Sequence, residues 1–500
     1  MLTLVLEHVS SPPAAMMITS LCVVGAVSAL AWSLPVTTTT RNKNKNKNTI
    51  PSVAVGLPIL GNLRRYCEDP VRFIDSATRR HGAFFAVPML LGRTIWLRSP
   101  QLNKKYLETP EDVWSFGDGM GMFLNKIVGP GYFDHLKAFV GSLSRGISRQ
   151  ATLEHYGHLA REETCKFLDD VSLPESPSTP LFEEVSLLVH KIIVRCLMGP
   201  DFYDHHVDEL YELLHDMEDN VGSLLHTLLP AWVPHAPARR LWAARDRMRD
   251  IFARRLRARE ANPKQWQHQD ALDYISYTLQ DASTAHLTKF YAAHHSLLMF
   301  AAHTSTVASV AWTLLELLKS PDRLATLRQE LRAHGDVNES PLLDALVKET
   351  GRHYAGHNDV RWARQPKTLR IPHASDDEDV VTVPAGTVVS ISPYLTHHDP
   401  DVWAHPDTYR PERWIEQPDL ARRMNDGTQL RYIPFGGGRH RCPGEKMATL
   451  LSKTVVATVV QQCDLRWGVG GDAQNTTALD FSKVGSPWLK GDVQVCWSRR

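Results

Sequence analysis

The sequence has little excess charge of either sign and few cysteines. Among 500 residues, 56 Lys and Arg balance 55 Asp and Glu, which gives a formal net charge of +1. A chain this neutral lacks the positive surface of nucleic-acid-binding proteins, and its 43% hydrophobic residues are too many for a disordered chain. The seven cysteines include no CxxC pair, which excludes a zinc ribbon, a thioredoxin-type motif and a disulfide scaffold. We therefore expect no nucleic-acid partner, and any cysteine that matters must be identified by its neighbours.

Charged residues are also missing between Glu7 and Arg41. Within this window, Ala15 to Leu34 is an apolar run that would form a helix of roughly 30 Å, the thickness of a hydrocarbon core. The alternative is a cleaved signal peptide, which has an apolar region of about 7–15 residues after a basic start. Here the start carries Glu7 and no Lys or Arg, and the run is longer. We therefore expect residues 1–36 to be an uncleaved transmembrane helix.

A basic tract follows, in which Arg41, Lys43, Lys45 and Lys47 alternate with Asn. Because positive flanks tend to remain cytoplasmic, this tract predicts a single-pass protein with its body on the cytosolic side. Pro and Gly then recur from residue 51 to residue 61, as in a turn-rich entry into a domain. We expect residues 37–62 to be a stalk and hinge, and residues 63–500 to form one catalytic domain without an internal linker.

The body reads as mainly helical with minor β-sheets. Residues 285–319 contain no Gly or Pro and are apolar on most faces, which predicts one long buried helix. Short β-like runs occupy residues 83–87, 94–97 and much of 359–392. Strands and helices do not alternate, which argues against a Rossmann domain. The glycines at 117, 119 and 121 lack the strand-helix context of a dinucleotide fingerprint, and we interpret them as a flexible access loop.

The strongest motif runs from Phe435 to Gly444, with the sequence FGGGRHRCPG. Its glycines allow a tight backbone that can approach a flat ligand closely. Cys442 comes directly before a predicted helix, with Pro443 in the favoured first-turn position. The positive helix end and the neighbouring arginines would stabilise a thiolate. No P-loop, zinc-protease helix or nucleophile elbow competes with this motif.

This segment resembles the haem-binding loop of the cytochrome P450 family, Phe-x-x-Gly-x-Arg/His-x-Cys-x-Gly. The resemblance implies the cytochrome P450 fold and a haem b whose iron is bound by the thiolate of Cys442. It also implies that Phe435 and Gly436 bind the cofactor and that His440 contacts a haem propionate. Arg361 is the expected second propionate partner, and Arg364 is the competing choice.

Two further family motifs follow the expected order. Glu349 and Arg352 match the Glu-x-x-Arg motif, whose side chains can pair one helical turn apart. Arg413, in the sequence PERW, resembles the arginine of the family's Pro-Glu-Arg-Phe. The resemblance implies that the three side chains form one charged cluster with a structural role, which requires mutual hydrogen bonds to offset desolvation.

The oxygen-side motif lies on the long helix, where residues 300–305 read FAAHTS. The resemblance gives Thr304 the place of the family's threonine and His303 that of its acid. A hydroxyl beside the iron can order water, and a titratable neighbour can resupply protons. The alternative is that Thr304, Ser305 and Thr306 only bond back to the preceding turn.

His-Thr-Ser at this point resembles the sterol 14α-demethylases. The likeness is incomplete, because that subfamily's Tyr and Thr-Pro-Val-Phe-Gly segment is missing and residues 353–358 read HYAGHN in place of Leu-x-Pro-Pro. The chain is therefore similar to a divergent member of the clan of sterol demethylases, bile-acid hydroxylases and prostacyclin synthase. Small fungal oxygenases of secondary metabolism are also similar. The triplet His397-His398-Asp399 lacks further metal ligands at recognisable spacing, which favours a polar loop.

The sequence thus predicts a monooxygenase of the endoplasmic reticulum membrane that inserts one oxygen atom from O2 into an apolar substrate, with a steroid or terpenoid favoured. Electrons would come from an NADPH–cytochrome P450 reductase, because the chain has no flavin or nicotinamide domain of its own. Two alternatives remain. One is a sterol 14α-demethylase proper, and the other is a haem-thiolate isomerase or dehydratase that acts on a peroxide without external electrons.

Overall fold

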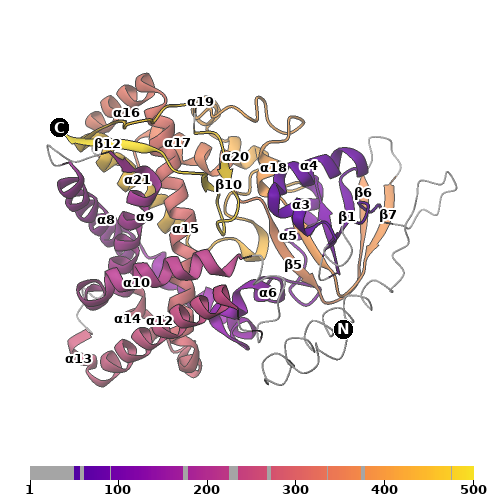
Figure 1. Cartoon of the computed structure of the whole chain (residues 1–500), viewed down its shortest axis with the longest axis horizontal. Coiled ribbons are helices and arrows are strands. Elements are labelled where there is room, and N and C mark those ends of the chain that lie inside the picture. The colour runs from indigo at the N-terminus through magenta and orange to yellow at the C-terminus, as the bar shows by residue number, and fades with distance from the viewer. Residues whose placement is uncertain are drawn as a thin grey trace, which may run out of the picture.

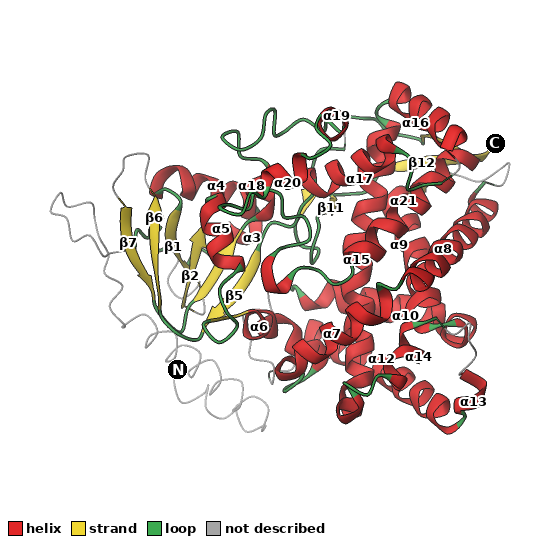
Figure 2. Ribbon diagram, turned by 180° about the vertical axis from the view of Figure 1, so that it is seen from behind, coloured by secondary structure: helices red, strands yellow, loops and turns green. Residues whose placement is uncertain are grey.

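A computed structural model describes residues 50–56, 61–89, 92–172, 178–223, 233, 235–266, 272–334, 336–372, 378–474 and 476–500. It is mainly helical, and the larger sheet lies at one end of the molecule while the long helix α15 runs through the helical part (Figure 1). The same division is visible from behind (Figure 2). The prediction of a mainly helical body with minor sheets is confirmed.

Capping residues and prolines at their first turns set the ends of several helices. Ser340 accepts a hydrogen bond from the N–H of Leu343, and Pro341 begins the helix, as expected for a capped N-terminus. The helices are α3 Leu63–Glu68, α4 Pro70–His81, α5 Pro100–Leu107, α6 Phe116–Val128, α7 Leu136–Ile147, α8 Gln150–Val171, α9 Leu181–Ile193, α10 Pro200–Val221, α12 Ala236–Ala261, α13 Pro263–Trp266, α14 Tyr274–Gln280, α15 Tyr291–Leu318, α16 Pro321–His334, α17 Pro341–His353, α18 Pro393–His397, α19 Glu412–Glu416, α20 Leu420–Met424 and α21 Glu445–Gln462.

The strands are short, and the sheet that they form at one end is mixed. They are β1 Phe84–Met89, β2 Gly92–Leu97, β3 Trp114–Ser115, β4 Thr179–Pro180, β5 Asp359–Ala363, β6 Lys367–Pro372, β7 Glu378–Val383, β8 Val388–Ile391, β9 Cys463–Trp467, β10 Leu479–Asp480, β11 Trp488–Leu489 and β12 Gln494–Arg499. The largest sheet has the order β1-β2-β8-β5-β3, in which β2 and β8 are parallel. The predicted hairpin of β1 and β2 is present, with Phe84 opposite Leu97. In the same sheet β5, which carries Arg361, pairs with β8.

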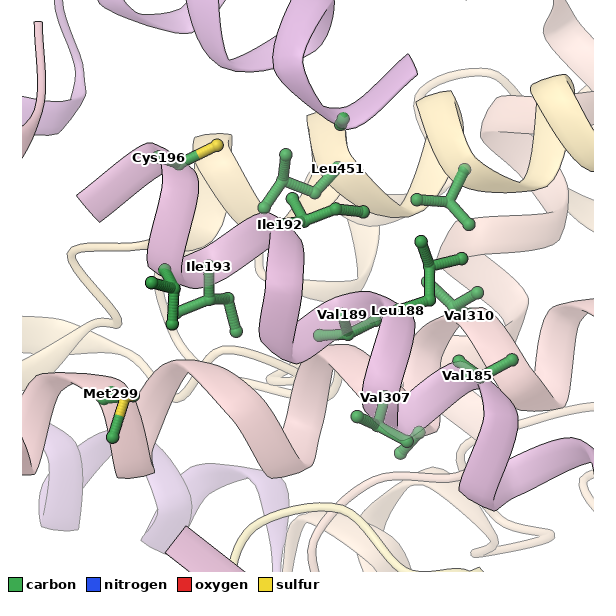
Figure 3. Packing of buried hydrophobic residues seen from close by; sticks show 14 of the residues in the cluster. Val185, Leu188, Val189, Ile192, Ile193, Cys196, Met299, Val307, Val310 and Leu451 are labelled. Carbon is green, nitrogen blue, oxygen red and sulfur yellow. The ribbon is translucent and has the colours of Figure 1, made fainter. Parts of the chain in front are cut away.

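The main core lies where three helices meet. Val185, Leu188 and Ile192 on α9 face Val307 and Val310 on α15, and Leu451 of α21 packs on the same cluster (Figure 3). All of these side chains are buried. Burying a Val or Leu side chain contributes about 1.5–3 kcal/mol. This packing fixes α15 and α21, the two helices that carry the predicted oxygen-side and cysteine motifs.

Two sequence predictions differ from the structure. The predicted helix 285–319 begins as a separate 3₁₀ turn, Ala285–Phe290, because Leu287 has non-helical angles (φ −110°, ψ 16°). The glycines expected to form a flexible loop lie instead within the helix α6, whose Ser115 cap accepts from the N–H of Asp118. Gly119 is needed there for contact, since a Cβ would lie 2.7 Å from the carbonyl oxygen of Val360 on β5.

Within the described residues, one stretch, Ala285–Leu318, is long and apolar enough to cross a membrane. It is 72% buried inside the protein over its most apolar window, which fits a core helix. The predicted anchor at 1–36 lies outside the described residues, as does most of the predicted stalk at 37–62.

Candidate active site

The loop that carries Cys442 is folded around its glycines. The N–H of Cys442 donates to the carbonyl of Phe435 at 2.9 Å. Gly436 and Gly438 have φ of +67° and +61°, a region that disfavours other residues. A Cβ at Gly438 would lie 2.3 Å from the carbonyl oxygen of Leu107, so this glycine also permits a close approach to the end of α5. The loop presents the Cys442 thiol, which is exposed, just before α21.

A buried ionic cluster lies on α17 and the segments around it. Arg352 donates to both carboxylate oxygens of Glu349 at 2.9 and 3.1 Å, and Arg413 lies 3.3 Å from the same carboxylate. Trp414 adds an indole N–H at 2.9 Å. The structure therefore brings together the three residues expected to meet. Because each charge has hydrogen-bonding partners, the desolvation cost of the cluster is offset.

The cluster reaches the cysteine loop through His397, a residue that sequence reasoning left in a polar loop. Its Nδ1 bonds to the carbonyl of Arg352 at 3.0 Å, and its Nε2 accepts from the N–H of Ile433 at 2.9 Å. Burial is the largest effect that holds the pKa of His397 well below its usual value. A neutral imidazole has one donor and one acceptor, which is what these two bonds require. Ile433 lies two residues before Phe435, so the bond anchors the start of the loop.

The predicted propionate partners lie beside the same loop. Arg361 is fully buried and donates to the carbonyls of Tyr106 at 2.8 Å, Thr109 at 3.1 Å and Leu107 at 3.3 Å. Its Nε is buried without a partner among the described residues. The carbonyl of Leu107 is the one that Gly438 approaches, so Arg361 lies close to the cysteine loop.

His440 and Arg364 are each paired with a carboxylate. The Nε2 of His440 lies 2.9 Å from Glu111, and its ring stacks on Phe116 at 4.8 Å. Burial raises the pKa of Glu111, but hydrogen bonds from His440, Ser115 and two backbone N–H groups outweigh it and lower the pKa to about 2. Arg364 pairs with Asp118 at 2.7 Å and is 43% exposed. The sequence left open whether Arg361 or Arg364 contacts a haem propionate. In the structure Arg361 is buried and Arg364 is exposed.

On α15, His303 and Thr304 point away from the open face of the helix. The Thr304 hydroxyl donates to Glu218 at 2.7 Å, and Nδ1 of His303 lies 2.9 Å from the same carboxylate oxygen. His303 also reaches Ser186 on α9 at 3.2 Å. Burial acts to raise the pKa of Glu218, but the bonds from His303 and Thr304 outweigh it, and the pKa is lowered. Glu218 on α10 is remote in sequence, and no local pattern predicts it.

The open face of α15 carries Ala301 and Ser305, which are exposed and half-buried respectively. Ser305 lines the main cavity of the described structure, which has a volume of about 2370 Å³. A Cβ at Gly485 would lie 2.4 Å from the Ser305 hydroxyl, so the segment 477–486 packs directly on this position. The hydroxyl of Thr306 bonds back to the carbonyl of Ala302, as in the alternative reading of the motif.

The cavity extends between this helix and the cysteine loop. Ile433, Pro434 and Gly436 contribute to its wall. Phe116, Met120, Phe123 and Leu124 of α6 supply an apolar part of the lining. Its outer part contains charged residues of both signs from α4 and the segment 398–407. The arrangement is a chamber of mixed polarity beside the cysteine loop, with an apolar part at α6 and the Ser305 hydroxyl of α15 in its wall.

The cytochrome P450 family model matches residues 51–487, and the chain belongs to the cytochrome P450 family. It is 66% identical over 378 residues to cytochrome P450 monooxygenase pytD of Aspergillus terreus, a match that covers 75% of this chain and 99% of that protein. It is 51% identical to cytochrome P450 monooxygenase pynD of Aspergillus niger, with 90% and 92% coverage. The chain is thus an oxidoreductase, a haem-thiolate monooxygenase.

More distant proteins share the fold. The chain is 25% identical to lanosterol 14-alpha demethylase of Cunninghamella elegans over 89% of this chain and 91% of that protein. The structure of retinoic-acid-bound cyanobacterial CYP120A1 superposes with a TM-score of 0.74 at 19% identity, covering 91% of this chain and 99% of that one. This likeness confirms the predicted cytochrome P450 fold of the body.

The cofactor of the family is haem with an axial cysteine thiolate, and the residues around Cys442 fit this group. The thiol is exposed beside a helix N-terminus, and the glycine-rich loop leaves no side chain between residues 436 and 438. The buried Nε of Arg361 has no partner among the described residues, as expected for a donor that a propionate would satisfy. These observations agree with a flat, anionic cofactor at this place.

Proposed function

We propose that the protein hydroxylates or otherwise oxygenates an apolar small molecule of fungal secondary metabolism, with Cys442 as the iron ligand. The observation that carries the assignment is the position of Cys442. Its thiol is exposed at the start of α21, in a loop whose glycines bring the backbone against α5. When bound, a haem with a thiolate ligand activates O2 for insertion into a C–H bond.

The spectrum of the reduced protein with carbon monoxide tests this assignment. We expect a thiolate-type Soret band in the wild type and its loss in Cys442→Ala. Cys67→Ala is the matched control, because Cys67 is also exposed but lies on α3. An unshifted band in the wild type, or a shifted band that survives in Cys442→Ala, would contradict the assignment.

On the oxygen side, we assign the contact with the cavity to Ser305. Thr304 and His303, the residues that the motif favours, would act behind it. They hold the buried carboxylate of Glu218 through bonds of 2.7 and 2.9 Å, so they can hold or pass a proton next to Ser305. Ser305 supplies the hydroxyl that orders water in the cavity, and Thr304 with His303 positions α15 against α10.

The charged cluster of Glu349, Arg352 and Arg413 has a structural role in this proposal. It holds His397, and His397 holds the segment leading into the cysteine loop. Phe435, Gly436, His440 and Arg361 complete the cofactor site from the loop and from β5. Arg361 is favoured over Arg364 because its side chain is buried beside Leu107, whereas Arg364 is engaged by Asp118.

Electrons would come from an NADPH–cytochrome P450 reductase. Arg439 and Lys446 are exposed next to Cys442 and would attract an acidic partner, while Arg441 is paired with Glu445 at 2.5 and 2.7 Å. Reversing the charge of Arg439 and Lys446 is expected to slow reduction by the reductase but not by dithionite. Equal rates with the reductase in both proteins would contradict this part of the proposal.

The predicted anchor at residues 1–36 and the basic stalk at 37–62 would place the catalytic domain on the cytosolic side of the endoplasmic reticulum membrane. The support is the sequence pattern of that segment. Fractionation of the full chain and of a chain starting at residue 50 tests it. We expect the full chain in the membrane fraction and release of the shortened chain.

Among the alternatives, a sterol 14α-demethylase proper is less favoured, because identity to those enzymes is 25% against 66% for pytD. A peroxide isomerase or dehydratase is also less favoured, since a cavity hydroxyl backed by a His–carboxylate pair suits proton delivery. Turnover that does not depend on NADPH would favour the isomerase instead.

A further inference from the structure

A polar segment of the cavity wall follows α17. Residues 356–358, which replace the proline-rich family sequence with Gly-His-Asn, line the cavity together with Tyr66 of α3. This part of the wall differs from α6, which contributes mainly apolar side chains, among them Phe116, Met120 and Phe123, together with Lys126 near its end. These residues have no assigned role in the cofactor site or in holding protons on α15.

His357 is held by ring contacts alone. Its ring lies 6.1 Å from that of Tyr66 and 5.5 Å from that of Phe481, which meets it edge-on. No hydrogen bond to its ring nitrogens is present among the described residues. Burial lowers the pKa of His357 to about 4, so the ring is neutral near pH 7. A neutral imidazole offers one N–H donor and one acceptor, and both are available to a ligand in the cavity.

Two neighbouring groups have spare hydrogen-bonding capacity. Asn358 donates to the hydroxyl of Tyr66 at 3.1 Å, which leaves the Tyr66 O–H free to donate. His398 stacks on Tyr394 at 4.0 Å and bonds through Nδ1 to the Tyr394 carbonyl at 2.9 Å. Its Nε2 is buried without a partner among the described residues. All four of these residues line the cavity.

This polar wall lies close to the oxygen-side hydroxyl. A Cβ at Gly356 would lie 2.7 Å from the carbonyl oxygen of Gly485, and a Cβ at Gly485 would lie 2.4 Å from the hydroxyl of Ser305. Gly485 therefore lies between Gly356, the neighbour of His357, and Ser305 on α15. A ligand held at His357 would extend toward Ser305 within one continuous chamber.

We propose that His357, supported by Tyr66 and Asn358, binds a neutral hydrogen-bonding group of the substrate, such as an amide, ketone or hydroxyl. The apolar remainder of the substrate would lie against α6. This inference rests on the proposed function and narrows its substrate class from a plain hydrocarbon to an apolar molecule with a neutral polar group. An ionic group is disfavoured, because the unpaired nitrogens belong to neutral rings and the charged rim carries both signs.

Calorimetric titration of the haem-loaded full chain with four probes of similar size tests the inference. The probes are 4-phenylbutanamide, 4-phenylbutanoate, 4-phenylbutylammonium and butylbenzene. We expect the amide to bind most tightly. His357→Phe keeps the ring contacts and removes the nitrogens, so it should weaken the amide about 3- to 10-fold, the equivalent of one hydrogen bond, and change butylbenzene by less than about twofold.

His357→Gln restores a donor and an acceptor and should recover the preference for the amide. Met120→Leu on α6 is the matched control and should change the affinities of the amide and butylbenzene alike. Equal effects of His357→Phe on both probes, or tightest binding of the anion or the cation, would overturn the inference. The carbon-monoxide spectrum of each variant reports the haem site separately, so a failed spectrum counts against the proposed function and not against this subsite.

Discussion

On the cysteine side of the cavity the loop itself is shaped by backbone contacts, and a side-chain cluster holds the segment before it, whereas on the α15 side the motif residues are held directly by side chains. Cys442 bonds through its N–H to Phe435, and Gly438 lies against the carbonyl of Leu107. On α15, Thr304 and His303 are fixed by Glu218, a side chain from another helix. The turn between Phe435 and Cys442 depends on a short contiguous sequence, while the contacts of Gly438 with Leu107 and of Thr304 with Glu218 depend on partners far along the chain. The four substitutions below test this difference, from the largest expected effect to the smallest.

The charged cluster behind the cysteine loop gives the largest expected effect. Glu349→Gln removes the carboxylate that pairs Arg352 and Arg413, and it leaves two buried cations without an anion. We expect a loss of about 3–5 kcal/mol in the free energy of unfolding, measured in urea, together with loss of haem. Glu412→Gln is the control. The Glu412 side chain is 41% exposed, so its ion pair with Arg323 should contribute at most about 1 kcal/mol to the free energy of unfolding. Similar losses in both variants would contradict the structural role of the cluster.

Gly438→Ala tests the backbone contact of the cysteine loop. A left-handed φ of +61° costs an alanine about 1–2 kcal/mol, and the Cβ would also lie 2.3 Å from the carbonyl of Leu107. Gly427→Ala has a φ of +83° with no atom within 4 Å of the added Cβ, so it carries the first cost without the clash. Haem content measured at saturating haem should fall in Gly438→Ala and stay near the wild-type value in Gly427→Ala. Full haem content in Gly438→Ala would show that the close approach is dispensable.

Glu218→Gln tests the side-chain anchoring of α15. Because the carboxylate accepts from both His303 and Thr304, its loss should cost about 1 kcal/mol at pH 7, measured by urea unfolding. The folded-state pKa of Glu218 is lowered, so its stabilising effect is complete above the ordinary glutamate pKa of about 4.3 and is lost as the pH falls from there through the lowered folded-state pKa. The difference between wild type and variant should therefore shrink progressively as the pH is lowered below about 4.3. A difference that grows on acidification would contradict the ionised state.

The smallest effect is expected at His295, one position from a histidine that is fully bonded. His295 is buried, and neither ring nitrogen has a partner among the described residues, whereas His294 bonds to Tyr132 and Tyr274 at 2.9 and 3.0 Å. His295→Phe should be nearly neutral at pH 7, while His294→Phe should cost about 1–3 kcal/mol. Melting temperatures of the two variants measure this contrast.

Acid should make wild type less stable relative to His295→Phe. Burial is the main cause that holds the pKa of His295 well below its usual value, so the unfolded chain takes up the proton first. Stability that His295 contributes above about pH 6.5 is then lost as the pH falls below it. We expect His295→Phe to gain stability relative to wild type between pH 7 and pH 5. No relative gain over this range would show that the His295 ring is not held in its neutral form.

The sequence predicted the class of the fold and the cysteine loop because both follow from contiguous patterns. The strands β5, β6, β7 and β8 lie where the β-like runs are, and Cys442 lies directly before a helix as its proline indicates. The glycines of α6 were misread as a loop. Their role, a close approach to β5 at Val360, depends on a tertiary contact that no local pattern specifies.

The oxygen side was harder to read because successive residues of an α-helix differ by about 100° in direction. Neighbouring residues of the motif therefore contact different parts of the molecule: Thr304 bonds to Glu218, and Ser305 lines the cavity. The catalytic role assigned to Thr304 and His303 stays a prediction. Glu218, His397 and His357 had no signal of their own in the sequence. The departure from the family pattern at residues 353–358 was visible, but its meaning required the cavity.

Imidazole binding to the haem iron of a matched pair of variants, Ser305→Val and Thr304→Val, tests most directly which hydroxyl faces the cavity. The two substitutions introduce the same side chain at adjacent positions. Added methyl groups at Ser305 should narrow the chamber and weaken imidazole about tenfold, as read from the Soret shift, and crowding against Gly485 should also lower the melting temperature. Thr304→Val should lower the melting temperature through loss of the Glu218 bond and leave imidazole affinity unchanged. If Thr304→Val weakens imidazole binding and Ser305→Val leaves the imidazole affinity unchanged, the account is contradicted.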